Sequence, residues 1–195
     1  MVSMIRDIDV ESIESLKTIF QLKEEDRAGW VLRGIEKPES VADHSWGTAI
    51  LSLLFHNDLN LVKCLKMSLV HDIIEAETGD IARSQINDEK DLKKKLEKEK
   101  KALKKLKAEL DPEIMEIYIE YKEKKTKEAL FVKDMDLIDM CLQALIYQEK
   151  KDLGNSNKPI NGDLDEFFST AESEISTKTG IKLYKEIKKK YNELK

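Results

Sequence analysis

The chain has 195 residues, of which 41% are hydrophobic and 37% charged, and its formal net charge is −5. This length suits one domain with a sizeable core, and the apolar content excludes a disordered chain. The negative charge gives no overall attraction to nucleic acid, so a ligand that carries phosphate must be held by a local site. We therefore predict one domain over residues 1–195 that takes a small molecule and no nucleic acid polymer.

The chain contains two cysteines, and both lie in apolar stretches, where a free thiol behaves as a small core side chain. Cys64 and Cys141 therefore favour a reducing, intracellular compartment. The N-terminus shows no signal-peptide pattern, and no segment approaches the ~20 apolar residues that cross a bilayer. We expect a cytoplasmic location and no membrane partner.

Helices are favoured throughout, because glycine (7) and proline (3) are scarce and hairpin dipeptides do not recur. Residues 10–22 show apolar positions at helical spacing, whereas residues 26–34 interrupt that pattern and predict an irregular segment. Pro38, followed by an acid, suits the first turn of a helix that continues to residue 55 or 56. Residues 59–74 are apolar on nearly every side and predict one buried helix.

The second half of the chain continues the helical pattern. Residues 87–110 are dominated by Lys and Glu with a narrow leucine stripe, which predicts a long solvated helix, although a partner-binding arm is the alternative. Asp111-Pro112 starts another helix, and residues 129–147 form a second strongly apolar one. Two further helices close the chain at about 163–176 and 180–194, so the predicted fold is all-α.

His71-Asp72 places an imidazole and a carboxylate on consecutive residues near the end of an apolar helix. Burying both groups without partners would be costly. On a continuous helix Glu75 would lie on the same side as both residues, since it follows them by four and three positions. Three ionisable groups are thus predicted to converge.

His44 supplies a second imidazole that faces the core, because the residues at helical spacing around it are mainly apolar: Val41, Thr48, Leu51 and Phe55. Each histidine alone could be an ordinary buried residue with one hydrogen bond. Two inward histidines and an inward aspartate in one small core instead favour a bound divalent cation. A fourth ligand should come from residues 129–147, but periodicity does not choose among Asp134, Asp136 and Asp139.

The order of His44, His71-Asp72 and a distant Asp136 resembles the H…HD…D pattern of the HD-domain metal-dependent phosphohydrolases, an all-helical superfamily. Four segments also resemble successive motifs of its 5′-deoxynucleotidase family: 26–33, 38–44, 71–80 and 132–136. The resemblance implies a single compact HD-domain helical bundle with a metal site in its core. The motif-bearing part covers about 27–150, and C-terminal helices over 160–195 pack on it.

The resemblance also implies the roles of individual residues. One divalent cation (Mn, Co, Zn, Ni, Fe or Mg) would be held by His44, His71, Asp72 and Asp136. Glu75 would carry out acid/base work, and Trp30 and Asp80 would contact the nucleotide. The family has an arginine beside its pocket tryptophan, but here Arg27 and Arg33 each stand three residues from Trp30, so either could bind phosphate. The resemblance further implies that the protein is a homodimer and that it releases phosphate from 2′-deoxynucleoside 5′-monophosphates.

Other interpretations remain open at this point. Trp30 could be a core aromatic, and Thr78-Gly-Asp80 could be an ordinary helix C-cap. The ligand set would also suit another HD-domain nucleotide phosphohydrolase or phosphodiesterase, or a non-catalytic metal-containing nucleotide-binding protein. Glu75 argues against the last of these, because a purely structural metal site has no evident use for it.

Overall fold

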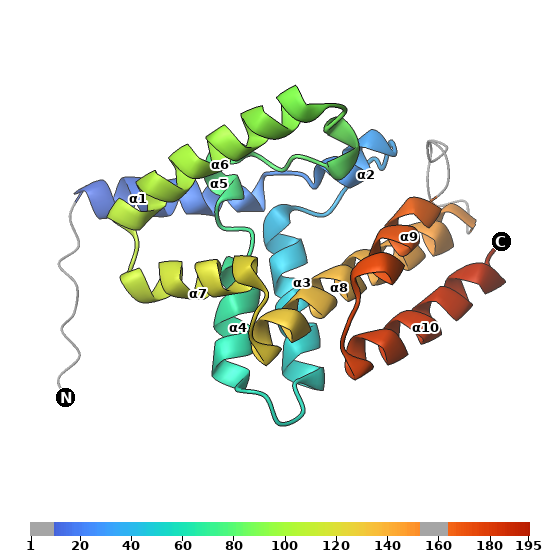
Figure 1. Ribbon diagram of the computed structural model, residues 1–195. Helices are drawn as coiled ribbons and strands as arrows, with labels where there is room; N and C mark the ends of the chain where they lie inside the picture. The colour runs from blue at the N-terminus through green and yellow to red at the C-terminus, as the bar shows by residue number, and fades with distance from the viewer. Residues whose placement is uncertain (1–9, 153–163) are drawn as a thin grey trace.

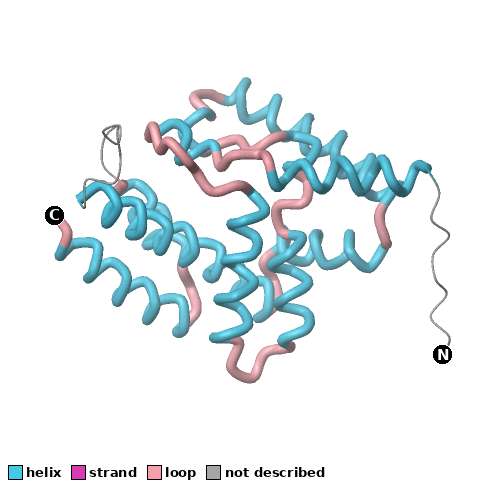
Figure 2. Tube along the Cα trace, turned by 180° about the vertical axis from the view of Figure 1, so that it is seen from behind, coloured by secondary structure: helices cyan, strands magenta, loops and turns pink. Residues whose placement is uncertain are grey.

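The computed structural model describes residues 10–152 and 164–195. Within these residues the regular elements are helices and no strand occurs, which confirms the predicted all-α fold (Figures 1 and 2). An isolated bridge joins Asp26 to Ser40. The α-helices in chain order are α1 (Val10–Phe20), α2 (Ala28–Leu32), α3 (Val41–Phe55), α4 (Leu61–Val70), α5 (Glu75–Thr78), α6 (Glu89–Glu109), α7 (Pro112–Glu123), α8 (Lys127–Asp152), α9 (Asp165–Glu174) and α10 (Lys178–Glu193). Two 3-10 helices, η1 (Gln21–Lys23) and η2 (Arg83–Gln85), complete the set.

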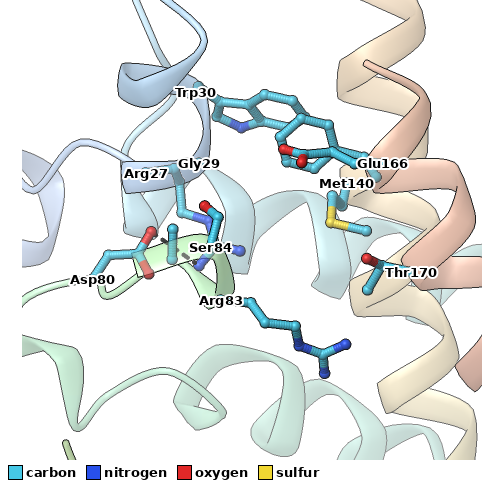
Figure 3. A pocket seen from close by; sticks show the side chains of 11 residues that line it. Arg27, Gly29, Trp30, Asp80, Arg83, Ser84, Met140, Glu166 and Thr170 are labelled. Atoms are coloured by element: carbon cyan, nitrogen blue, oxygen red, sulfur yellow. Dashed lines mark ion pairs between the residues drawn. The ribbon is translucent and has the colours of Figure 1, made fainter. Parts of the chain in front are cut away.

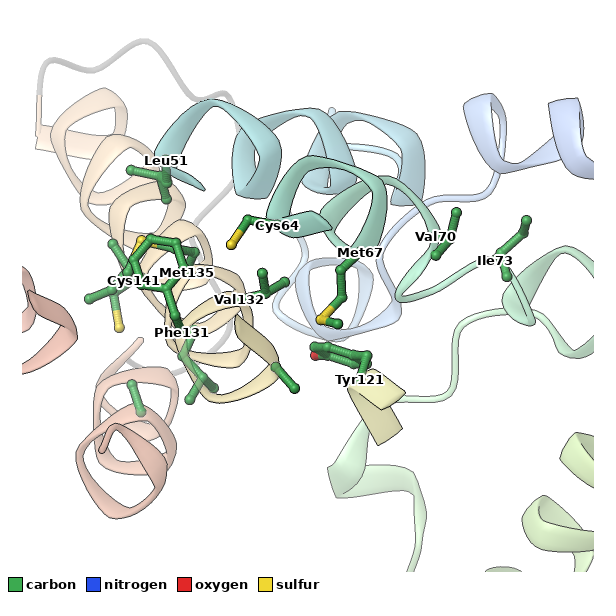
Figure 4. Packing of buried hydrophobic residues seen from close by; sticks show 14 of the residues in the cluster. Leu51, Cys64, Met67, Val70, Ile73, Tyr121, Phe131, Val132, Met135 and Cys141 are labelled. Atoms are coloured by element: carbon green, nitrogen blue, oxygen red, sulfur yellow. The ribbon is translucent and has the colours of Figure 1, made fainter. Parts of the chain in front are cut away.

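Three helices form the centre of the molecule, since α3 packs against α4 and both pack against α8. On one side α9 and α10 cover α8, and at the other end α1, α5 and α6 lie together (Figure 1). Cys64 and Met67 of α4 face Val132 of α8, with Tyr121 of α7 beside them (Figure 4). Burying a side chain such as Met67 stabilises the fold by about 1.5–3 kcal/mol. The two cysteines are free and buried, as predicted.

The start of α3 differs from the prediction based on Pro38. The helix begins at Val41, because Ser40 and Asp43 form a capping box. The Asp43 amide donates to Ser40 Oγ at 3.1 Å, and the Ser40 amide donates to Asp43 Oδ2 at 2.9 Å. Pro38 therefore lies outside the helix, and Glu39 lies in the extended segment before it. The corresponding prediction for Asp111-Pro112 is confirmed, with Pro112 in the first turn of α7.

The predicted helix over 59–74 is wrong at its C-terminal end. Helix α4 stops at Val70, and residues 71–74 form turns that lead into the short helix α5. The Ser68 carbonyl, the acceptor for the amide of residue 72 in a continued helix, accepts from His71 Nδ1 at 2.7 Å. Hydrogen bonds between residues three apart, as in a 3-10 helix, follow. An example is the Glu75 amide, which donates to Asp72 O at 2.9 Å. His71 and Asp72 therefore sit on a helix end rather than inside a helix.

Residues 26–34 are also more regular than predicted, because α2 lies within them. The Ala28 amide at its N-terminus donates to Asp80 Oδ2 at 2.8 Å. The first amides of a helix have no acceptor inside the helix, and Asp80 supplies one here. The other predicted helices occur within a few residues of their expected ends. Residue 163, the predicted start of the penultimate helix, lies outside the described residues. In the part of the chain that the structure describes, no helix is long and apolar enough to cross a membrane.

Candidate active site

Two imidazoles and two carboxylates meet where α3, the end of α4 and α8 come together. His44 Nε2 lies 3.2 Å from His71 Nε2 and 3.2 Å from Asp136 Oδ1. Asp72 Oδ2 lies 3.2 Å from His71 Nε2 and 3.7 Å from His44 Nε2. Both histidines are buried. The structure thus brings together the four groups proposed as metal ligands. The ligand atoms of His44, His71 and Asp72 lie within 4.8 Å of one another, close enough to hold one metal ion.

The Nδ1 atoms of both imidazoles, which point away from the candidate metal site, form hydrogen bonds. His71 Nδ1 donates to Ser68 O, and His44 Nδ1 donates to Asp139 Oδ2, each at 2.7 Å. A carbonyl and a carboxylate only accept, so each Nδ1 carries a hydrogen. In neutral rings the two Nε2 lone pairs would then face each other across 3.2 Å. The site therefore favours a positive charge between them.

The acid–base behaviour of His44 supports this need for positive charge. Burial lowers the pKa of His44, but hydrogen bonds to Asp136 and Asp139 outweigh that effect and raise the pKa to about 10. Without a cation, a proton on Nε2 therefore satisfies the surrounding carboxylates. A divalent cation would take the place of that proton. Two imidazole nitrogens and two carboxylates suit Mn, Fe, Co, Ni or Zn, so the residues present fit the metal that the sequence predicts.

Helix α8 carries the three aspartates among which the sequence pattern could not choose. Asp136 Oδ1 faces His44, while its Oδ2 accepts from Tyr121 Oη at 2.7 Å and Lys133 Nζ at 2.9 Å. Asp134 Oδ2 instead accepts from the Thr177 amide at 2.7 Å before α10. Asp139 holds Nδ1 of His44. Of the three, Asp136 lies with the other candidate ligands.

The two candidate arginines occupy different places. Arg27 Nη1 lies 3.2 Å from Asp72 Oδ2, 3.7 Å from Asp80 Oδ2 and 3.8 Å from Glu75 Oε2. Arg33 instead pairs with Glu166 of α9. Arg27 is thus the arginine that lies beside the imidazole–carboxylate group, with Asp80 next to it (Figure 3).

Glu75 lies beside this group, although not for the reason expected. The prediction that Glu75 shares a helical face with His71 is wrong, because Glu75 begins the separate helix α5. Its Oε2 is buried and has no hydrogen-bond partner among the described residues. Burial and the negative charges of Asp72 and Asp80 raise the pKa of Glu75 to about 9, against the opposing effect of Arg27. A carboxyl group in such surroundings can hold a proton at neutral pH.

The segment 78–80 forms a helix C-cap, and the ligand contact expected of Asp80 stays a prediction. Gly79 caps α5 at a φ of +69°, which is the left-handed backbone that favours glycine, so the C-cap reading holds. Asp80 then turns back towards α2 and accepts from the Ala28 amide. The same carboxylate also lines the cavities described below.

Trp30 is at once a core aromatic and the wall of a cavity. Its ring is only 2% exposed and packs against Phe167 and Tyr147, at centroid distances of 4.2 and 5.2 Å. Its Nε1 donates to Glu39 Oε1 at 2.8 Å. Burial and the neighbouring Asp139 raise the pKa of Glu39 to about 7. These contacts fix the orientation of the indole above the cavity (Figure 3).

Two adjoining cavities share the lining residues Arg27, Asp80, Arg83, Met140 and Thr170. One, of about 420 Å³, contains the candidate metal ligands His71, Asp72 and Asp136. Around them lie cationic side chains (Arg83, Lys95, Lys122, Lys124 and Lys133) together with the carboxylates of Glu99 and Glu174. The other, of about 330 Å³, is lined by Trp30 and Phe167 and extends to Met140 and Thr170 on the opposite wall (Figure 3). A polar compartment that contains Arg27 and the candidate metal ligands therefore opens onto one with aromatic walls, which suits a molecule with a phosphate at one end and a ring at the other.

Sequence reasoning missed two residues that support Asp136. Lys133 lies three positions before it on α8, a spacing that pairs charges on a helix and could have indicated the contact. Tyr121 comes from α7, and nothing in its local sequence pointed to this contact. Only the packing of α7 against α4 and α8 places its hydroxyl there.

The profile described as the HD domain matches residues 19–180. The chain is 36% identical over 180 residues to 5′-deoxynucleotidase HDDC2 of Mus musculus, covering 91% of this chain and 86% of that relative. It is 38% identical over 144 residues to 5′-deoxynucleotidase hdd1 of Schizosaccharomyces pombe, covering 69% and 71%. The crystal structure of the PH0347 protein from Pyrococcus horikoshii OT3 is similar at a TM-score of 0.71 and 30% identity, covering 94% of this chain and 99% of that one.

Proposed function

Because this chain belongs to the HD domain family, we propose that it is a metal-dependent 5′-deoxynucleotidase that releases phosphate from 2′-deoxynucleoside 5′-monophosphates. Relatives of similar length carry the name 5′-deoxynucleotidase. The observation that carries the proposal is the convergence of four ligand groups beside a polar cavity that contains Arg27 and adjoins an aromatic one. A non-catalytic binding protein would have no use for the buried carboxyl of Glu75 in that cavity, whose Oε2 has no hydrogen-bond partner among the described residues.

One divalent cation would be held by His44, His71, Asp72 and Asp136. When bound, it neutralises phosphate oxygens and lowers the pKa of water. Its identity is open among Mn, Co, Zn, Ni, Fe and Mg, although imidazole nitrogens favour the transition metals. Lys133 and Tyr121 keep Asp136 Oδ1 directed towards His44, because both bind its other oxygen.

The chain's own residues supply the remaining steps. Arg27 binds the non-bridging oxygens of the phosphate, since its guanidinium matches their geometry and already lies beside Asp72. Glu75 lies next to Arg27 and moves a proton from the attacking water to the 5′-oxygen of the leaving nucleoside. Asp80 holds α2 through the Ala28 amide and so fixes the distance between Arg27 and the metal ligands.

The nucleoside lies in the aromatic compartment. Trp30 is held rigidly by Phe167, Tyr147 and Glu39, so it presents a fixed wall to the sugar and base. A fixed indole beside the sugar would leave little room for an additional 2′-hydroxyl, which supports the proposed preference for deoxyribose. Arg33 has no contact with substrate in this arrangement, because it pairs with Glu166.

The protein is a cytoplasmic homodimer in this proposal. Buried free thiols at Cys64 and Cys141 suit a reducing compartment. Large apolar side chains are exposed on α3, where Trp46 is 66% and Leu54 64% accessible, and such side chains suit a contact with a second copy. Light scattering on purified protein tests the dimer directly, and a monomeric mass would contradict it.

The activity is tested by measuring phosphate release from a panel of nucleotides after metal reconstitution. We expect 2′-deoxynucleoside 5′-monophosphates to be cleaved faster than their ribose counterparts, and cyclic nucleotides and triphosphates not to be cleaved. Equal rates on deoxy and ribo monophosphates would contradict the sugar preference. Cleavage of only cyclic nucleotides or triphosphates would replace the proposed reaction by another HD-domain activity.

A further inference from the structure

Asp139 is a carboxylate of α8 that the proposed reaction does not use directly. Its Oδ2 accepts from His44 Nδ1 at 2.7 Å, and its side chain is 13% exposed. Since a carboxylate only accepts, this contact places the hydrogen of the neutral ring on Nδ1 and leaves Nε2 free. The Nε2 atom is the one directed towards His71 and Asp136.

The backbone of α3 makes room for this carboxylate at Gly47. A Cβ atom added to Gly47 would lie 2.0 Å from Asp139 Oδ1 and 2.8 Å from its Cγ, closer than real contacts allow. Glycine inside a helix costs about 1 kcal/mol relative to alanine. At Gly47 the missing Cβ allows the close approach of Asp139 to the helix that carries His44.

We propose that Asp139 is a positioning residue for the metal ligand His44, and that Gly47 is glycine so that Asp139 can reach it. The proposal rests on the metal site proposed above. The carboxylate holds the imidazole in one tautomer and one orientation, and it makes Nε2 a stronger donor to a cation. Glu39 lies beside Asp139 and accepts from Trp30, so the same contact joins the metal ligand to the wall of the aromatic compartment.

The same helix offers a matched control. Asp134 is another buried aspartate of α8 that approaches a glycine, since a Cβ on Gly180 would lie 2.4 Å from Asp134 Oδ2. Asp134 accepts from the Thr177 amide and hydroxyl, at 2.7 and 2.6 Å, and so holds α10. The two aspartate–glycine pairs differ in their partners, because one holds a histidine ring and the other a helix start.

The test measures Co²⁺ binding by calorimetry and visible absorption, together with thermal unfolding of the metal-free protein, for Asp139→Ala, Asp139→Asn and Asp134→Ala. Loss of a group that orients a metal ligand weakens metal binding about 10- to 100-fold, so we expect this for Asp139→Ala. Asp139→Asn keeps an acceptor oxygen and should recover most of the affinity. Asp134→Ala should lower the unfolding temperature and bind Co²⁺ as the unaltered protein does.

The glycines give a second pair of variants that leaves both carboxylates in the chain. Gly47→Ala should weaken Co²⁺ binding as Asp139→Ala does, and Gly180→Ala should not. Unchanged affinity in Asp139→Ala, or in Gly47→Ala if the former does not fold, would overturn the proposal. An equal loss of affinity in the Asp134 and Asp139 variants would also overturn it. Absence of Co²⁺ binding by the unaltered protein would instead refute the metal site itself.

Discussion

At the scale of single residues, the site depends on carboxylates that lie close together and differ in their partners. Asp72 lies beside His71 and Arg27, and the hydrogen bond from His71 with the positive charge of Arg27 holds the pKa of its carboxyl below the usual range despite burial. Glu75 lies near the same arginine at a longer distance and has its pKa raised. One carboxylate is therefore suited to bind a cation and the other to hold a proton.

Glu75→Ala should lower kcat by about 10²- to 10⁴-fold, because it removes the group that moves the proton. Metal content and fold should not change, since none of the four proposed ligands is altered. Phosphate release and elemental analysis on the same preparation check both statements. Glu77→Ala is the control, because Glu77 pairs with Lys105 of α6 and should leave activity unchanged. Activity near that of the unaltered protein in Glu75→Ala would refute the role of Glu75.

Arg27→Ala should lower kcat/KM for a deoxynucleoside monophosphate by about 10- to 100-fold, since a hydrogen bond to a charged group contributes about 1.5–3 kcal/mol. Arg33→Ala is matched to it in chemistry and in distance from Trp30 along the chain. It should retain activity, because Arg33 pairs with Glu166. Steady-state kinetics on both variants decide between the two arginines, and a larger loss in Arg33→Ala would reverse the assignment.

At the scale of elements, helix ends carry the chemistry. His44 lies in the first turn of α3, His71 caps α4, and Glu75 opens α5. Helix ends leave backbone groups without partners inside the helix, so side chains there take part in capping and are held in place by it. The capping box of α3 and the Asp80 carboxylate at the start of α2 both act in this way.

Ser40→Ala should destabilise the protein by about 0.5–2 kcal/mol, because it removes the acceptor for the Asp43 amide at the start of α3. Denaturant unfolding measures this loss. Ser169→Ala serves as the control, since Ser169 is exposed on α9 and such changes usually stay within about 0.5 kcal/mol. Equal stability of the two variants would mean that the capping box contributes little.

At the scale of the whole molecule, the metal site joins helices that are distant in the sequence. His44 comes from α3, His71 from the end of α4 and Asp136 from α8. A cation bound by all three therefore stabilises the folded state over the unfolded chain, in which the ligands are apart. The division into one domain over 1–195 remains a prediction.

Removing the metal should therefore lower the unfolding temperature, and Co²⁺ at about 100 times its dissociation constant should restore about 2.7 kcal/mol. His71→Ala should lose this response to Co²⁺, because it deletes one of the proposed ligands. Thermal unfolding with and without Co²⁺ measures it, with Arg33→Ala as a variant that keeps the response. An undiminished response in His71→Ala would contradict the ligand assignment.

The amino-acid sequence by itself determined the all-α class, the positions of most helices and the two histidines that face the core. Apolar periodicity and the scarcity of glycine and proline are local properties, and they persist in any packing of the helices. The resemblance of four short segments to one family pointed to the metal ligands and the reaction before any geometry was known.

Only the tertiary structure decided among residues that a local pattern treats alike. Asp134, Asp136 and Asp139 all lie on the apolar helix α8, and they differ because α10, α7 and α3 respectively pack around them. Arg27 and Arg33 are equally far from Trp30 in sequence, but α9 brings Glu166 to one and α5 brings Glu75 near the other. Hydrogen-bond and ionic partners from other helices set these roles, and sequence spacing within one helix carries no information about such partners.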